Sequence, residues 1–141
     1  MKAIRINNYG GPEVLSLEDV HQPQPDAGEV LVRIEAAGVN FVDVYQRQGI
    51  YAGELPFTPG LEAAGVVIAL GDDVSGVCVG DRVAYGTHLG SYAQLAVVPS
   101  SKLVPIPDGM GIDMGAAVLV QGMTAPEKTV PREARPVPYL V

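Results

Sequence analysis

Three things are scarce in this sequence: cysteine, runs of basic residues and long apolar stretches. Cys78 is the only cysteine among 141 residues, which excludes a disulfide within the chain and a cysteine-rich zinc site. Nine lysines and arginines against sixteen aspartates and glutamates give a formal charge of -7, which argues against a surface for nucleic acid or an anionic membrane. No apolar run is long enough to cross a bilayer and no signal-peptide pattern opens the chain, so we expect a cytoplasmic protein.

Glycine and proline are abundant and divide the chain into short segments. Seventeen glycines and twelve prolines favour strands joined by tight turns over long helices. Alternating or continuous apolar residues predict strands at 1–6, 14–17, 29–34, 60–70, 79–85 (after a turn), 91–98 and 102–106. Helical spacing predicts two short helices, one from Asn40 to Gly49 and one over 113–124. We therefore expect a mainly β fold, a compact barrel with helical appendages.

The last sixteen residues differ in composition from the rest of the chain. Residues 126–141 contain four prolines, several charges and no glycine. Proline lacks the amide hydrogen that a helix needs and clashes with the preceding turn. We expect one domain over 1–125 and an extended tail over 126–141.

Seven short stretches follow one another in an order that is specific although each stretch alone is weak. They are 10–15 (GGPEVL), 28–33 (GEVLVR), 40–51 (NFVDVYQRQGIY), 59–62 (PGLE), 79–83 (VGDRV), 90–93 (GSYA) and 121–125 (QGMTA). Together they resemble the N-terminal part of the zeta-crystallin-like NADPH:quinone oxidoreductases, which belong to the medium-chain dehydrogenase/reductase superfamily. The resemblance implies a GroES-like β-barrel, and NADPH as the cofactor of the full-length family.

The zinc ligands of related metal-dependent dehydrogenases are missing. By resemblance, those enzymes carry a cysteine within the segment that matches 38–43 and a histidine where this chain has Leu61. Asp43 and Glu62 alone could not complete a zinc site, which commonly needs three protein ligands and an open position. We therefore expect no metal and reject a zinc alcohol dehydrogenase. Glu62 is expected to be a structural partner of the site rather than a catalytic base.

The resemblance also implies which residues face the reaction. Hydride passes directly from the nicotinamide to a quinone or conjugated carbonyl, so the protein positions and polarises the reactants. Asn40, Tyr45 and Tyr51 are the candidate catalytic residues, because the first two can donate hydrogen bonds and Tyr51 offers an aromatic face. The residues expected to contact the cofactor are Asn40, Asp43, Tyr45, Gln121, Met123 and Thr124.

Each of these residues also has a purely structural interpretation. Asn40 could serve only as the N-cap of its helix. Asp43 and Arg47 lie one helical turn apart and could form a surface ion pair of small value. Tyr45 and Tyr51 could be ordinary aromatic residues at the rim of the barrel.

No glycine-rich dinucleotide-binding loop follows a strand in the last third of the sequence. The sixteen residues after Ala125 are too few for a βαβ unit, which needs roughly 30. We therefore expect a truncated form that lacks the Rossmann domain, binds NADPH weakly or not at all, and is inactive alone. The alternative is a non-enzymatic binding or interaction module derived from the same family. The expected partners are a small quinone or enone and a second copy of the chain, which would associate through the exposed helix 113–124; nucleic acid and membrane are not expected.

Overall fold

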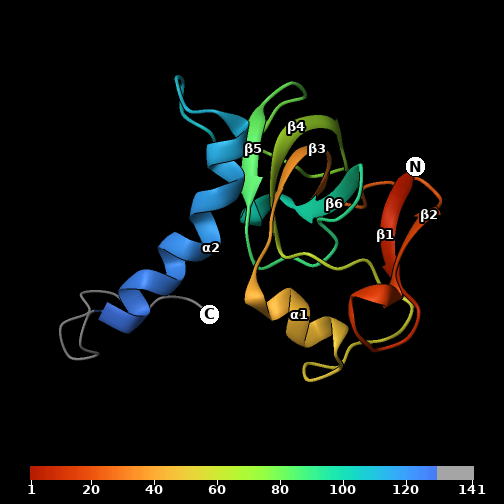
Figure 1. Cartoon of the computed structure of the whole chain (residues 1–141). Helices are drawn as coiled ribbons and strands as arrows, with labels where there is room; N and C mark the ends of the chain where they lie inside the picture. Colours follow the sequence, from red (N-terminus) through yellow and green to blue (C-terminus); the bar gives the residue numbers. More distant parts are fainter. Residues whose placement is uncertain (130–141) are drawn as a thin grey trace.

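Five antiparallel strands form the main sheet of the computed structural model, which describes residues 1–129 (Figure 1). In the order in which they pair, they are β6 (Leu95–Pro99), β3 (Glu29–Gly38), β4 (Glu62–Leu70), β5 (Arg82–Tyr85) and β7 (Val104–Pro105). A separate hairpin pairs β1 (Lys2–Ile6) with β2 (Leu15–Asp19), and isolated bridges join it to Phe57 and Ala93. The mainly β fold with two helices that the sequence predicts is confirmed.

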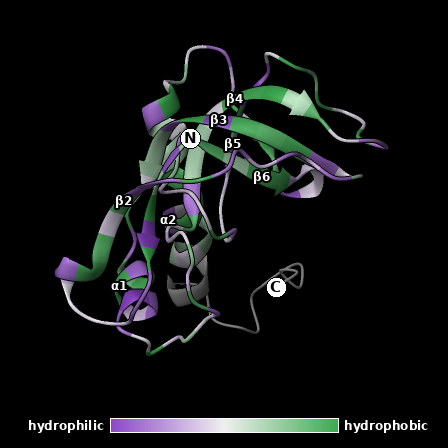
Figure 2. Cartoon of the chain, turned by 90° about the vertical axis from the view of Figure 1, so that its right-hand side faces the viewer, coloured by the Kyte–Doolittle hydropathy of each residue, from purple (hydrophilic) through white to green (hydrophobic). Residues whose placement is uncertain are grey.

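Small β-branched residues form the core between the curved strands. Val30, Val32, Val67, Val83 and Val98 are all buried in one cluster. The pleat places alternate side chains of a strand on the same face, so Val30 and Val32 of β3 both point inward. Figure 2 shows that β3 and β4 are hydrophobic over most of their length, as expected for strands in the middle of a sheet.

Two helices are attached to this sheet. Helix α1 (Phe41–Arg47) follows β3 directly, and helix α2 (Ile112–Thr129) follows β7 after a short loop. The first half of α2 packs on the sheet through a second cluster, which combines Ala116 with Ala64, Ala84 and Ile106. The remaining short elements are the 3-10 helices η1 (Pro12–Val14) and η2 (Ser100–Lys102). Within residues 1–129, no helix is long and apolar enough to cross a membrane.

Two predicted strands are shorter in the structure than the sequence pattern suggests. The strand predicted over 91–98 begins only at Leu95, because the amides of Ser91 and Tyr92 donate to the carbonyls of Gly60 and Pro59 in the loop before β4. The strand predicted over 102–106 is reduced to Val104–Pro105, because η2 occupies the residues before it. Alternation of apolar residues does not distinguish a strand from a loop that lies along one.

The prediction that the second helix stops before Pro126 is wrong. Helix α2 continues through Pro126 to Thr129. Proline removes a single amide donor, and the residues after it can keep helical backbone angles even where the ladder is interrupted. The rest of the expected tail, residues 130–141, lies outside the described residues.

Gly65 allows the two central strands to approach each other. A Cβ atom at this position would collide with the carbonyl oxygen of Arg33 and lie 2.8 Å from its carbonyl carbon. It would also lie 3.1 Å from the Cα atom of Ile34. All three are backbone atoms, so the collision could be relieved only by moving β3 away from β4.

Gly65→Ala should therefore lower the free energy of unfolding by about 1–3 kcal/mol, the usual cost of overpacking a core. Gly53→Ala is the matched control, because no atom lies within 4 Å of a Cβ there and its change should stay within about 0.5 kcal/mol. Urea unfolding of the two variants measures the difference. Equal stability of both variants would show that the strands do not pack as described.

Candidate functional site

Asn40 lies at the start of α1, just after β3, and a hydrogen bond connects its side chain to α2. It is 7% exposed, and its Nδ2 donates to Glu62 Oε2 at 3.2 Å. Its Oδ1 accepts a hydrogen bond from Gln121 Nε2 of α2 at 2.9 Å. The side-chain amide is thus engaged at both ends, which fixes its orientation. Capping α1 is not the only role of Asn40.

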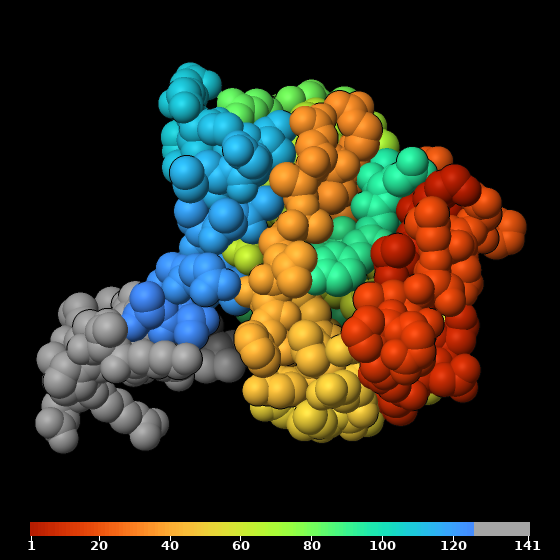
Figure 3. Space-filling model, in the orientation of Figure 1, coloured from red at the N-terminus to blue at the C-terminus, as the bar shows by residue number. Residues whose placement is uncertain are grey.

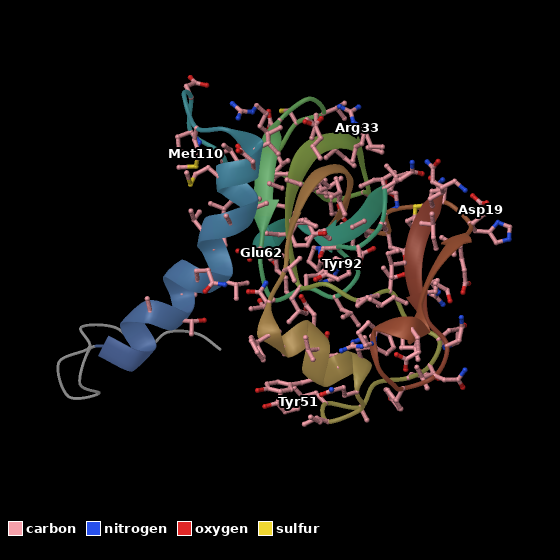
Figure 4. The ribbon with its side chains drawn as sticks, in the orientation of Figure 1. Asp19, Arg33, Tyr51, Glu62, Tyr92 and Met110 are labelled. Atoms are coloured by element: carbon pink, nitrogen blue, oxygen red, sulfur yellow. The ribbon has the colours of Figure 1, made fainter. Side chains whose placement is uncertain are left out.

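Glu62 is the buried carboxylate behind Asn40, placed between β4 and α2 (Figure 4). It is 1% exposed, and its Oε1 accepts the backbone N–H of Val120 at 2.7 Å. Each carboxylate oxygen therefore has a donor, as a buried charge requires. Both oxygens are engaged within the fold, so Glu62 is a structural partner of the site, as the sequence predicts.

Asp43 is a second buried carboxylate, one helical turn into α1. Its Oδ2 accepts the backbone N–H of Asn40 at 2.8 Å and the hydroxyl of Tyr92 at 2.7 Å. The ion pair with Arg47 that the i,i+4 spacing allows is not formed. Among the described residues, ion pairs within 4.0 Å occur only at Lys2–Asp19 and Arg33–Glu35. Asp43 therefore ties α1 to the loop that precedes β6.

Two tyrosines near the site have a raised pKa, which favours the neutral phenol. Burial raises the pKa of Tyr92 well above its ordinary value, and the hydrogen bond to the charged Asp43 raises it further. Burial alone raises the pKa of Tyr85, whose hydroxyl finds no hydrogen-bond partner among the described residues. Both phenols are therefore proton donors at neutral pH, but only the Tyr92 hydroxyl has an acceptor.

Three aromatic rings form an exposed group on α1 and the loop after it, which we call the aromatic cluster (Phe41, Tyr45 and Tyr51). The centroids of Phe41 and Tyr45 lie 6.0 Å apart, and those of Tyr45 and Tyr51 lie 5.8 Å apart with the rings perpendicular. Tyr45 is 37% exposed and Tyr51 is 59% exposed. Aromatic rings that gather on a surface are a typical feature of binding sites.

Of the three α2 residues expected at the cofactor, only Gln121 bonds directly to the start of α1. The hydroxyl of Thr124 donates to the carbonyl oxygen of Val120 within the helix, at 2.7 Å. Met123 is half exposed, and its methyl group lies beside Gly86 at the end of β5. The structure thus brings Asn40, Gln121 and Glu62 together and leaves Tyr45 and Tyr51 as a separate aromatic group.

Sequence reasoning missed the roles of Tyr92 and Val120. Tyr92 belongs to a recognised motif, GSYA, but nothing in the motif indicates that its hydroxyl reaches Asp43, which is 49 residues away in sequence. Val120 contributes a backbone amide, which no side-chain pattern can reveal. Both contacts depend on how segments distant in sequence meet.

Comparison with known proteins adds to this geometry. The model of the alcohol dehydrogenase GroES-like domain matches residues 26–108. A quinone oxidoreductase of Pseudomonas aeruginosa is 47% identical over 125 residues, which cover 87% of this chain and 38% of that protein. The chain thus spans about two fifths of the length of the curated relatives that it matches.

Solved structures agree with the sequence relatives. A quinone oxidoreductase of Pseudomonas syringae superposes with a TM-score of 0.89 at 41% identity, covering 96% of this chain and 42% of that one. The Escherichia coli quinone oxidoreductase, solved in complex with NADPH, gives a TM-score of 0.88 at 33% identity, covering 91% of this chain and 40% of that one. The expected GroES-like barrel and the resemblance to quinone oxidoreductases are both confirmed.

Loss of the hydroxyl should change the stability of the fold in opposite directions for Tyr92, which has a hydrogen-bond partner, and Tyr85, which has none among the described residues. Tyr92→Phe leaves Asp43 with one donor fewer and should cost about 1 kcal/mol, because the phenol is partly exposed. Tyr85→Phe removes a buried hydroxyl without a partner and should be neutral or stabilising. Thermal or urea unfolding of the two variants at neutral pH measures both changes.

The pH dependence of stability provides the control for this pair. A raised tyrosine pKa contributes stability that is fully present below the ordinary value of 10.0 and is lost as the pH rises above it. The unsubstituted chain should therefore lose stability above pH 10, and each variant should lose less. An unchanged pH profile in both variants would contradict the raised pKa values.

Proposed function

This chain belongs to the alcohol dehydrogenase GroES-like domain family, and on that premise we propose that it forms the substrate-side barrel of a quinone oxidoreductase. The reaction proposed is transfer of hydride from NADPH to a quinone or conjugated carbonyl, without zinc. The observation that carries the proposal is that the polar group around Asn40 lies at the start of α1, while the exposed aromatic cluster follows the same short helix from Phe41 to Tyr51 in the loop after it. The aromatic cluster offers a flat apolar surface, and the polar group offers oriented hydrogen bonds.

The donor set around Asn40 supports chemistry without zinc. Zinc requires nitrogen, thiolate or carboxylate ligands in a tetrahedral arrangement. Leu61 precedes Glu62 and offers none, and both oxygens of Glu62 are already engaged by donors. Across the described side chains, no group of three or more histidine, cysteine, aspartate or glutamate residues could hold a metal. Quinones need little activation by a Lewis acid, so oriented hydrogen bonds suffice.

We propose that the polar group around Asn40 takes the nicotinamide end of NADPH and not its phosphates. When bound, the cofactor supplies the hydride. Asn40 Nδ2 has a second hydrogen beyond the one given to Glu62, and Gln121 lies beside it, so both can bond to a carboxamide. Asp43 and Glu62 are acidic, and the guanidinium-bearing side chain of Arg47 on α1 is buried. We propose that groups outside residues 1–129 hold the phosphates.

The aromatic cluster is the proposed site for the quinone ring. Tyr45 and Tyr51 stand perpendicular to each other, so a planar ring can lie against the face of one and the edge of the other. Their hydroxyl groups can donate to the quinone carbonyl, where negative charge develops as hydride arrives.

Cys78, a free and exposed thiol, suits the reducing cytoplasm that we propose as the compartment.

The 141-residue chain by itself should bind a quinone without reducing it. Loss of correct placement of two reactants forfeits roughly 7–11 kcal/mol of barrier lowering. Titration with duroquinone, followed by amide NMR, should shift the signals of Tyr45 and Tyr51. Tyr51→Ala should weaken binding by about threefold to tenfold, the factor for one aromatic contact. NADPH absorbance should stay constant when both compounds are present.

Leu17→Ala is the matched control, because Leu17 is an exposed apolar residue on β2, away from α1. It should bind duroquinone as the unsubstituted chain does. Absence of saturable binding, or equal binding by the Tyr51 variant, would contradict the proposed substrate site. NADPH oxidation that depends on Tyr51 would contradict the proposed inactivity of the chain alone.

The surface of α2 favours a second candidate function, an interaction module that associates with another copy of the chain. Met114, Val118 and Met123 are all exposed on this helix. Figure 3 shows α2 (blue) along one edge of the molecule, with much of its surface open on this face. Exposed apolar side chains on one helix are typical of contact surfaces.

Sedimentation equilibrium should therefore show association that the double variant Met114→Ser, Val118→Ser weakens at least tenfold. The reason is that burial of two apolar side chains in a dimer is worth roughly 1.5–3 kcal/mol each. Val79→Ser is the control, since Val79 is at least as exposed as Met114 and Val118 but lies in the turn before β5. A monomeric unsubstituted chain at high concentration would exclude this second function.

A further inference from the structure

One amide of α2 donates its hydrogen bond to a side chain outside the helix. Val120 lies in the middle of α2, where an N–H ordinarily donates to the carbonyl four residues earlier, that of Ala116. Its N–H donates at 2.7 Å to Oε1 of Glu62, which belongs to β4. A side chain that enters the helical ladder is one of the established causes of a bend. Figure 1 shows α2 changing direction part-way along its length.

Gly38 provides the space that this carboxylate occupies. A Cβ atom at Gly38 would collide with Oε2 of Glu62 and would lie 2.7 Å from the carbonyl oxygen of Ala116. The carboxylate of Glu62 and the carbonyl of Ala116 therefore both lie against the last residue of β3. The absence of a side chain at this position is what allows α2 to approach the sheet with Glu62 between them.

The two halves of α2 are held in different ways. Before Val120, the helix packs on the sheet through apolar contacts of Ala116 with Ala64 and Ile106. From Val120 onward, polar contacts are added: Glu62 accepts the Val120 amide, and Gln121 bonds to Asn40, while the side chains of Val120 and Met123 lie beside Gly86. Because Glu62 also accepts from Asn40, a single carboxylate connects β4, α1 and the second half of α2.

We propose that Glu62 is a positioning residue that bends α2 at Val120 and so directs the second half of the helix relative to the barrel. The bend determines where residues 121–125 lie with respect to Asn40. One acceptor atom is required for the Val120 amide, and the second polar atom of the side chain must have a partner in Asn40. This role concerns the geometry of the fold and holds whether or not a quinone is the substrate.

The isosteric amide should preserve the bend, whereas an apolar side chain should not. In Glu62→Gln, the new oxygen can accept from Val120 and the new NH₂ can donate to Asn40, provided the amides of Asn40 and Gln121 both turn over. Every group then keeps a partner. In Glu62→Leu, no side-chain acceptor remains for Val120, so only the carbonyl of Ala116 can accept its N–H, which should straighten the helix.

Pulsed EPR distances between spin labels test this difference. In a Cys78→Ser background, labels at the exposed positions 101 and 123 report the direction of the second half of α2. Labels at 101 and 113 are the control, because both lie before the bend. Glu62→Leu should shift or broaden the 101–123 distance distribution by several ångströms, and Glu62→Gln should leave it unchanged. The 101–113 distribution should stay the same in both variants.

An unchanged 101–123 distribution in Glu62→Leu would overturn the proposal, as would an equal shift in Glu62→Gln. If the leucine variant does not fold, the unsubstituted chain gives a second test. Scalar coupling across the hydrogen bond, between the amide nitrogen of Val120 and the carboxyl carbon of Glu62, should be detectable by NMR. Its absence in a folded chain would contradict the proposal.

Discussion

The structure depends on one buried carboxylate that has two donors. Glu62 is almost fully enclosed and stands between the sheet and both helices, and its charge is compensated by hydrogen bonds from Asn40 and Val120. Removing one hydrogen-bond donor from a buried charge lowers the stability of the fold, because neither water nor another protein group replaces that donor. The start of α1 and the middle of α2 are therefore held in one arrangement. This arrangement determines the positions of the side chains that face outward from the two helices.

This constraint divides the candidate site into a fixed part and an adaptable part. Asn40 and Gln121 belong to the fixed part, since each makes hydrogen bonds that determine how its amide is turned. Tyr45 and Tyr51 belong to the adaptable part, since they contact each other through ring edges and remain open to solvent. In the function that we propose, the rings are the site for a planar substrate, and the fixed amides orient a carboxamide beside it.

The sequence predicted the fold better than it predicted the contacts that the candidate residues make. Alternation and turn residues were sufficient for a mainly β fold, and the resemblance identified the GroES-like barrel and the quinone oxidoreductase relatives. The tie between Asp43 and Tyr92 was not predictable, because it joins segments that meet only after the barrel closes. The continuation of α2 past Pro126 was also missed, since a proline removes one amide donor but does not force the residues after it out of helical backbone angles.

The central claim is that Glu62 serves the fold as a hydrogen-bond acceptor and is not available to a metal. Calorimetric titration of the chain with zinc, in a Cys78→Ser background, tests this most directly. With both carboxylate oxygens engaged and Leu61 as its neighbour, we expect no stoichiometric binding and the same small heats in Glu62→Gln. One zinc ion bound tightly per chain, and lost in Glu62→Gln, would contradict the account.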